Sequence, residues 1–360
     1  MKAAVLTSYG APLELVEVDV DEPSADEVLI QTHASGICHT DRTVQQGVHG
    51  SPIPNVLGHE AAGVVLRVGS AVDSVRVGDH VVTCPSGFCG SCEWCQRGLI
   101  HLCTDKGRDR GPGRRSRVTW DGHDVTSMSG IGGYAEQLLV SERAVVPISK
   151  DMPLDRAALL GCAVVTGMGS VLNRARVRPG ETVAVLGIGG VGLNVVQAAR
   201  LSGAARIIAI DRIPAKLERA LLFGATDVVD ASATDAVAAV RELTGGGVDH
   251  SFEVVGRPET VEQALAMLRV RGTTTLVGVP APSSRISVPP MDLMAEKRLQ
   301  GSNMGSSRYR LDIPFFVGLY LAGRLRLDEL VSQRIALADV NDALDGIDDT
   351  TGARSVITFA

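Results

Sequence analysis

The stretch Thr182-Val183-Ala184-Val185-Leu186-Gly187-Ile188-Gly189-Gly190-Val191-Gly192 decides the fold of this chain. Apolar and β-branched residues at its start predict a strand, and the apolar pattern over 193–201 predicts a helix. A strand, a G-x-G-x-x-G turn and a helix in this order are typical of dinucleotide binding. Because the chain has 40 glycines, the flanking strand and helix carry the argument. The alternative is an ordinary glycine-rich turn.

The three motif glycines have separate mechanical roles. Gly187 permits the tight turn, Gly189 lets the backbone approach a pyrophosphate, and Gly192 lets the helix pack on the strand. The free N–H groups at the helix N-terminus would bind the phosphates.

The strand that follows the helix indicates which cofactor is bound. It covers 206–210 and ends in Asp211, 19 residues past Gly192, where a carboxylate accepts hydrogen bonds from the adenosine ribose. A 2′-phosphate would meet this negative charge, so Asp211 favours NAD over NADP. Arg212 follows directly and weakens that preference.

The rest of the chain divides into two patterns. Strands and helices alternate from about 164 to 303, with a helix over 214–223 and strands over 248–255 and 273–280, which predicts an α/β doubly wound parallel sheet. Short alternating runs make residues 1–150 β-rich. We therefore expect a nucleotide-binding domain over 164–303 and a second domain formed by 1–163 and 304–360.

Composition excludes several classes of protein. The chain has 360 residues and a net charge of −6 without a basic stripe, which argues against nucleic acid as a partner. The longest uncharged stretch, 157–172, is shorter than the roughly 20 apolar residues of a membrane span. The apolar run at the N-terminus is too short for a signal peptide. An odd count of seven cysteines indicates metal ligands in a reducing compartment, so we expect a cytoplasmic protein.

Four cysteines form the strongest local motif. Cys89, Cys92, Cys95 and Cys103 have the spacing C-x2-C-x2-C-x7-C, which can fill every position of a tetrahedral zinc. An iron–sulfur cluster is the alternative. Cys84 lies outside the motif, at the end of an apolar strand, and is interpreted as a small buried hydrophobe.

Three further segments carry candidate metal ligands. The first is Gly36-Ile37-Cys38-His39-Thr40-Asp41, interpreted as a loop, and the second is Gly58-His59-Glu60. The third, Cys162, lies in an apolar run just before the nucleotide-binding pattern. Each has an ordinary alternative: incidental loop residues, a hydrogen-bonded structural histidine and a core cysteine.

The segment 104–131 is polar and rich in Arg and Gly. We expect a solvent-exposed surface loop. A subunit contact or a position over the substrate entrance is the alternative.

Taken together, these motifs resemble the zinc-dependent medium-chain alcohol dehydrogenases over nearly the whole chain. The resemblance is to the branch with class III-like, bacterial benzyl-alcohol and mycothiol-type formaldehyde dehydrogenases. It implies a Rossmann domain and a β-rich, GroES-like catalytic domain with a zinc lobe at about 84–104. It rests on 36–41, 58–60, the four-cysteine motif, Gly161-Cys162, 187–192, Asp211, 278–280 and 352–354.

The resemblance also implies roles for single residues. Cys38, His59 and Cys162 would bind a catalytic zinc, and the four-cysteine motif a structural zinc. Two thiolates and a neutral imidazole cancel the zinc charge and leave an open position, whereas four thiolates close the site. Thr40 would hydrogen-bond the substrate hydroxyl, Asp41 would orient His59, and Glu60 would lie behind the metal. The implied cofactor contacts are His39, Thr166, Gly187, Gly189, Gly190, Val191, Gly192, Asp211, Arg212, Lys216, Val279 and Arg354.

By resemblance, the activity is NAD-linked interconversion of primary, bulky or aromatic alcohols and aldehydes, with hydride leaving a zinc-bound alkoxide. The alternatives are a mycothiol- or glutathione-adduct formaldehyde dehydrogenase, a nicotinoprotein alcohol:acceptor oxidoreductase and a non-catalytic NAD-binding protein. The long insertion resembles that of dimeric members, so we expect a homodimer, with a tetramer as the alternative.

The chain departs from the family at four positions. Thr43 stands where many members have a histidine that completes the proton relay, so the relay would end at a ribose hydroxyl and water, or at His39. Pro85 replaces an aromatic wall residue and indicates a differently shaped pocket. Val48 and Gly50 replace acidic residues of the glutathione-dependent enzymes, which weakens the glutathione alternative and leaves mycothiol open.

Overall fold

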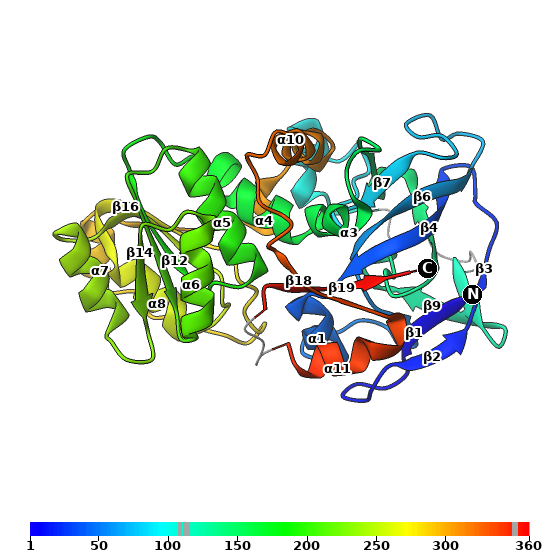
Figure 1. Ribbon diagram of the computed structural model, residues 1–360, viewed down its shortest axis with the longest axis horizontal. Helices are drawn as coiled ribbons and strands as arrows, with labels where there is room; N and C mark the ends of the chain where they lie inside the picture. The colour runs from blue at the N-terminus through cyan, green and yellow to red at the C-terminus, as the bar shows by residue number, and fades with distance from the viewer. Residues whose placement is uncertain (107–109, 111–115, 348–351, 360) are drawn as a thin grey trace. The chain divides into compact units, whose positions relative to one another are not determined.

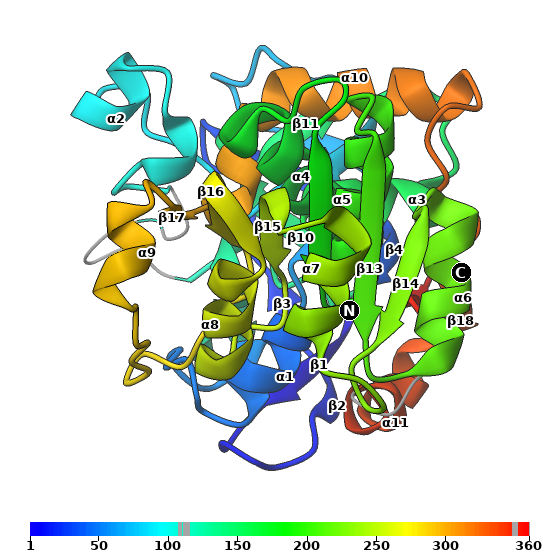
Figure 2. The ribbon, with the colours of Figure 1, turned by 90° about the vertical axis from the view of Figure 1, so that its left-hand side faces the viewer.

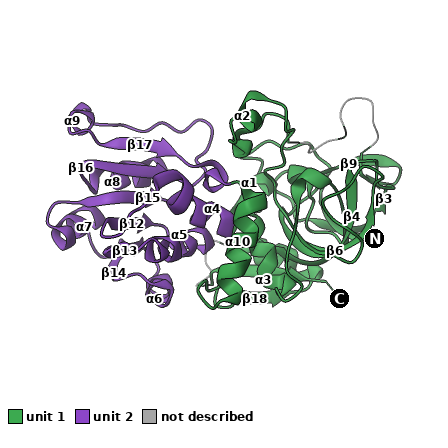
Figure 3. Ribbon diagram, turned by 90° about the horizontal axis from the view of Figure 1, so that it is seen from above, with its two compact units in different colours: residues 1–163, 308–360 green, residues 164–307 purple. Residues whose placement is uncertain are grey.

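The computed structural model describes residues 1–106, 110, 116–347 and 352–359. These residues form two compact units, coloured separately in Figure 3. Unit 1 contains 1–163 and 308–360, and unit 2 contains 164–307.

Unit 2 is a doubly wound parallel sheet with the strand order β14-β13-β12-β15-β16-β17. Helices α5 and α6 pack on one face of the sheet, and α7 and α8 on the other (Figures 1 and 2). The chain runs outward from β12 to β13 and β14 and then returns to β15, so the order reverses beside β12. The strands are β12 (Thr182–Leu186), β13 (Arg206–Asp211), β14 (Asp227–Asp230), β15 (Val248–Glu253), β16 (Leu268–Leu276) and β17 (Arg298–Gly301). The helical segments are α4 (Ala163–Gly169), the π-helical η5 (Ser170–Ala175), α5 (Gly190–Leu201), α6 (Pro214–Phe223), α7 (Ala236–Thr244), α8 (Pro258–Ala266), α9 (Pro290–Met294) and η6 (Asn303–Ser306).

Two strands of unit 2 differ from their predicted ranges, and the one expected over 248–255 is β15, which ends at Glu253. The strand expected over 273–280 is β16, which begins at Leu268 and ends at Leu276. Its first residue pairs with Val248, and the register shifts before the next pair, so the apolar alternation is broken there. Val279 lies beyond the last ladder pair and is exposed.

Unit 1 is built on two sheets. One has the order β2-β1-β5-β9-β8-β3, and the other has the order β11-β7-β6-β4-β19-β18 with β10 also paired to β4. The strands are β1 (Lys2–Leu6), β2 (Glu14–Glu17), β3 (Asp19–Val20), β4 (Glu27–Gly36), β5 (Asn55–Val56), β6 (Glu60–Val68), β7 (His80–Thr83), β8 (Val118–Trp120), β9 (His123–Ser127), β10 (Gln137–Ser141), β11 (Val145–Pro147), β18 (Val331–Ile335) and β19 (Arg354–Thr358). The helical segments are α1 (His39–Gln45), α2 (Glu93–Gln96), η1 (Ile100–Leu102), η2 (Met128–Gly130), η3 (Glu142–Ala144), α3 (Leu154–Ala157), η4 (Ala158–Gly161), α10 (Tyr309–Leu321), η7 (Leu337–Asp339) and α11 (Val340–Asp345).

The expectation of a surface loop over 104–131 is wrong for the part from Val118 onward, whereas residues 104–106 lie outside any helix or strand, as expected. Strands β8 and β9 form a hairpin through Asp121-Gly122, both with positive φ, and bury Val118 and Val125. An Asp-Gly pair between two short strands is a hairpin signal that the sequence analysis passed over. Residues 107–109 and 111–115 of the expected loop lie outside the described residues.

A buried ion pair ties the same segment to β4. The Arg110 guanidinium donates to both oxygens of Glu27, at 3.0 and 2.7 Å, and Arg117 donates to Glu27 at 2.7 Å. Burial opposes the charge on Glu27, but these hydrogen bonds outweigh it and lower the pKa of Glu27 to about 2. Arg110 is therefore an anchor in the core of unit 1, although the composition around it is that of a loop.

Within the described residues, no single helix is long and apolar enough to cross a membrane. One bent pair of helical segments, Leu154–Gly161 and Ala163–Ala175, reaches the necessary length and apolar composition when the two segments are taken together.

Candidate active site

Cys38 lies at the start of a helix and not within a loop. Helix α1 follows it, and the Cys38 N–H donates to Asp41 Oδ2 at 2.8 Å. A carboxylate in the first turn compensates the free amides at a helix N-terminus. This cap accounts for the spacing of Cys38 and Asp41 and corrects the expected loop.

Gly58 and Tyr134 position His59 just before β6. Gly58 has a φ of +88°, and a Cβ atom there would lie 2.5 Å from the Tyr134 ring, so only glycine fits. His59 Nδ1 bonds Asp41 Oδ1 at 2.9 Å. This partner leaves Nε2 as the imidazole nitrogen that can bind a metal.

The structure brings together side chains that are far apart in the sequence. The sulfur atoms of Cys38 and Cys162, one His59 ring nitrogen and one Glu60 oxygen all lie within 4.8 Å of one another. We call Cys38, His59 and Cys162 the donor set. Two thiols and an imidazole are ligands that zinc prefers, and three protein ligands of this kind are typical of a catalytic zinc, with the Glu60 oxygen close by. The donor set therefore fits a catalytic zinc.

Charge in the donor set is distributed unevenly. A hydrogen bond from the Cys162 thiol holds the pKa of Cys38 well below its usual range, and the same bond raises the pKa of Cys162. Burial lowers the pKa of His59, but the Asp41 carboxylate outweighs burial and raises it well above its usual value. Because a metal needs deprotonated thiols and a neutral imidazole, zinc uptake here would release protons.

Glu60 is a buried carboxyl beside the donor set. It is 0% exposed, and neither of its oxygens has a hydrogen-bond partner among the described residues. Burial raises the pKa of Glu60 to about 7, although the Arg354 charge opposes the rise. Arg354 lies 3.5 Å away, and its Nη1 donates to the Ile37 carbonyl at 3.0 Å. Contact of Arg354 with a pyrophosphate stays a prediction.

Three residues of α1 lie at positions that concern the predicted proton relay. Thr40 is half-buried, and its hydroxyl lies 3.7 Å from the Cys38 sulfur. The Thr43 hydroxyl donates to the Thr40 carbonyl at 2.9 Å. His39 is exposed in the first turn.

The sequence analysis missed Tyr134. Its side chain is fully buried, and its hydroxyl donates to Asp41 Oδ2 at 2.7 Å. One tyrosine after two glycines is a weak signal, and nothing in its spacing connects it to Asp41.

The four-cysteine motif forms a second cluster, which we call the lobe. Its four sulfurs lie within 4.8 Å of one another. The Ser91 and Cys92 amides donate to the Cys89 sulfur at 3.4 and 3.2 Å, and hydrogen bonds from Ser91 and these amides lower the pKa of Cys89 to about 6. Four thiols in this arrangement fit one closed tetrahedral zinc. Cys84 is buried outside the lobe, and burial raises its pKa to about 12.

The glycine-rich turn of unit 2 has the shape that a dinucleotide needs. A Cβ atom on Gly192 would lie 1.9 Å from the Gly187 carbonyl oxygen, so the helix start and the strand end are in direct contact. A Cβ atom on Gly189 would have no neighbour within 4 Å, which leaves open space above the turn. Asp211 Oδ2 accepts a hydrogen bond from the Ile188 amide at 2.7 Å and so joins β13 to the turn.

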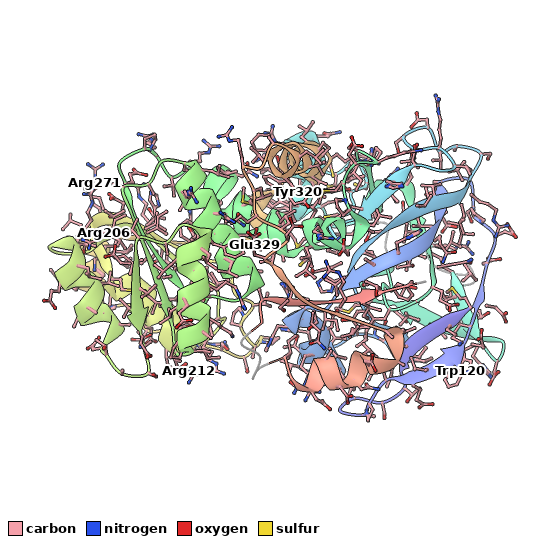
Figure 4. The ribbon with its side chains drawn as sticks, viewed as in Figure 1. Trp120, Arg206, Arg212, Arg271, Tyr320 and Glu329 are labelled. Carbon is pink, nitrogen blue, oxygen red and sulfur yellow. The ribbon has the colours of Figure 1, made fainter. Side chains whose placement is uncertain are left out.

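The remaining predicted cofactor contacts all lie in unit 2. Arg212 is exposed (Figure 4), and Lys216 and Val191 are half-buried at the starts of α6 and α5. The Thr166 hydroxyl lies 3.8 Å from the Met304 sulfur. Their contacts with a cofactor stay predictions.

Comparison with known proteins identifies two domain families. Residues 24–150 match the alcohol dehydrogenase GroES-like domain, and residues 190–318 match the zinc-binding dehydrogenase family. An S-(hydroxymethyl)glutathione dehydrogenase from Synechocystis is 38% identical, over 99% of both chains.

Solved structures agree with this assignment. The benzyl alcohol dehydrogenase of Acinetobacter calcoaceticus is 33% identical with a TM-score of 0.95, over 100% of this chain and 99% of its own. A Sinorhizobium meliloti structure, described as a zinc-binding dehydrogenase bound to NADP, is 30% identical with a TM-score of 0.84, over 99% of both chains. Zinc and a nicotinamide nucleotide are thus the cofactors of this oxidoreductase, and the chain belongs to the zinc-dependent medium-chain alcohol dehydrogenases.

Proposed function

We propose that the protein is an NAD-linked alcohol dehydrogenase that interconverts primary, bulky or aromatic alcohols and their aldehydes. The observation that carries this proposal is the buried donor set, in which His59 is oriented by Asp41 at 2.9 Å. Cys38, His59 and Cys162 would hold the catalytic zinc, and Cys89, Cys92, Cys95 and Cys103 the structural zinc.

The bound cofactors supply the two parts of the chemistry, since zinc acts as a Lewis acid toward the alcohol oxygen and the nicotinamide ring accepts the hydride. The protein has to position the alcohol and remove its proton. Thr40 is suited to the first step of proton removal because its hydroxyl lies beside the Cys38 sulfur, 3.7 Å away. Burial of the donor set excludes water and strengthens each electrostatic contact.

The proton must then reach solvent without a histidine at position 43. The Thr43 hydroxyl is already donated to the Thr40 carbonyl. His39 is exposed in the same helical turn and can exchange protons with water. We propose His39 as the end of the relay, with a cofactor ribose hydroxyl and water as the alternative route.

Asp211 supports NAD as the physiological cofactor. Its carboxylate stands at the end of β13, where it would repel a 2′-phosphate. Arg212 is exposed next to it and reduces the discrimination. We expect a preference for NAD that Asp211→Ser weakens, measured as the ratio of kcat/KM for the two cofactors.

Two residues favour a plain alcohol over a glutathione adduct. Val48 is 43% exposed, and Gly50 is exposed beside it, in the loop before Gly58. A glutathione adduct carries ammonium and carboxylate groups, and uncharged residues here offer the ammonium no partner. Similarity to the Acinetobacter benzyl alcohol dehydrogenase supports the same choice.

The thiol-adduct dehydrogenase is the second candidate, because the Synechocystis relative bears that name at 38% identity. A mycothiol adduct is the other substrate proposed for this candidate.

One set of assays separates these functions. Purified protein with NAD would be given benzyl alcohol, aliphatic alcohols, or formaldehyde with glutathione or mycothiol, and NADH would be followed by absorbance. NADH from benzyl alcohol supports the main proposal, and NADH only from a thiol adduct supports the second. Reduction of an added aldehyde at the expense of a second alcohol, without added NAD, would indicate a nicotinoprotein. The predicted homodimer is tested separately by light scattering.

A further inference from the structure

Tyr134 connects the two segments that carry Cys38 and His59. Its N–H donates to the Leu57 carbonyl at 2.9 Å, and the N–H of Gly133 donates to the Gly58 carbonyl at 2.8 Å. Its own carbonyl accepts from the Ala4 amide at 2.9 Å. The backbone of Tyr134 is therefore fixed against the residues just before His59.

The ring of Tyr134 is fixed as well. It is 0% exposed, and it packs so closely over Gly58 that a Cβ atom there would approach it to 2.5 Å. A ring with so little freedom places its hydroxyl at a defined point. That point is 2.7 Å from Asp41 Oδ2.

Asp41 receives donors on both of its oxygens. Oδ2 accepts from the Cys38 amide at 2.8 Å and from the Tyr134 hydroxyl, and Oδ1 bonds His59 Nδ1. Without the hydroxyl, Oδ2 would keep only the amide, and a fully buried carboxylate would lose a donor that it cannot replace with water. Rotation of the carboxylate would then turn Oδ1 and the imidazole bonded to it.

We propose that Tyr134 is a positioning residue for the catalytic metal, acting through Asp41 on His59. The inference rests on the proposed donor set. Tyr134 touches neither substrate nor metal in this assignment. Its hydroxyl holds the Asp41 carboxylate in the one orientation that aims His59 Nε2 at the zinc.

The test is metal release from the whole protein loaded with zinc. The protein is mixed with excess chelator, and zinc release is followed with a colorimetric indicator. Wild-type protein should release zinc in two phases, and Cys38→Ser should lack the phase that belongs to the donor set. Substitution of a residue that orients a metal ligand typically lowers metal affinity about 10- to 100-fold. Tyr134→Phe should therefore accelerate the donor-set phase about tenfold and leave the lobe phase unchanged.

A matched control is Tyr309→Phe. Tyr309 is also buried in unit 1, but its hydroxyl bonds the Arg143 carbonyl and has no part in the donor set. This variant should leave the donor-set phase unchanged. Equal acceleration by both variants, or acceleration of both phases by Tyr134→Phe, would indicate general loosening and overturn the inference.

Two further measurements distinguish positioning from loss of stability. With Co²⁺ in the donor set, Tyr134→Phe should shift the visible d–d absorption bands, which report ligand geometry, and Tyr309→Phe should not. In an Asp41→Asn background, Tyr134→Phe should add no further acceleration, because its path to the metal is already changed. Unshifted bands, or additive effects, would refute the role of Tyr134. A wild-type protein with a single release phase would refute the donor set itself.

Discussion

The donor set and the lobe both contain cysteine sulfurs, but the two clusters differ in burial and in how far apart their residues lie in the sequence. The lobe takes all its ligands from 89–103, and Cys89, Cys92 and Cys95 are only half-buried. The donor set draws on the residue before α1, the residue before β6 and the residue after η4, and it lies in the core of unit 1. Amides and Ser91 surround the lobe sulfurs, whereas charged side chains surround the donor set. The proposed structural site is thus local in the sequence, whereas the proposed catalytic site is assembled by the packed core.

Cys38→Ser tests the reactive side of this comparison and should have the largest effect. Loss of one of the three proposed ligands would remove the Lewis acid, so kcat/KM should fall by at least about a thousandfold, or about 4 kcal/mol. Zinc content should drop from two ions to one per chain while the fold persists by circular dichroism. Retained turnover would contradict the zinc mechanism.

Cys92→Ser tests the structural side. Opening the lobe should release its zinc and lower the thermal unfolding midpoint, because binding energy at a structural zinc is folding energy. Freshly prepared protein should keep most of its initial rate and lose it faster on warming. An immediate, complete loss of turnover with both zinc ions retained would show that the lobe takes part in chemistry.

Asp41→Asn tests how strongly zinc binding at the donor set depends on the orientation of His59 by Asp41. The amide oxygen can still accept from His59, but the charge is lost, and the NH2 group in place of Oδ2 cannot accept from the Cys38 amide or the Tyr134 hydroxyl. We expect zinc affinity at the donor set to fall about 10- to 100-fold, measured by chelator competition. An unchanged affinity would mean that the ligands alone fix the geometry.

Ser91→Ala is the matching change in the lobe and should have the smallest effect. Its hydroxyl lies 3.6 Å from the Cys89 sulfur in a solvent-accessible region, where backbone amides remain. Zinc release from the lobe should change by less than about threefold, since a weak, exposed hydrogen bond contributes about 1 kcal/mol or less. A change as large as that of Asp41→Asn would erase the contrast between the two sites.

Local signals predicted much of unit 2 and the lobe. The helix over 214–223 is α6, which has one helical apolar face, and the strand before Gly187 is β12, which is a continuous apolar run. Prediction failed at β16, where the register shifts, and at 104–131, where Arg110 is held by Glu27 from β4. The contact of Arg110 with Glu27 joins residues far apart in the sequence, whereas the β8–β9 hairpin had a local Asp-Gly signal that was passed over.

The sequence by itself determined the family, the nucleotide-binding turn and the four-cysteine motif, because each depends on residue types at short, fixed spacings. Only the tertiary structure decided that Cys38 caps a helix and that Tyr134 bonds Asp41, whereas the contact of Asp41 with His59 was already implied by the family resemblance. The physical reason is that burial and hydrogen-bond direction are set by distant backbone segments. Spacing can name candidate ligands, but the packed core determines which atoms they present to a metal.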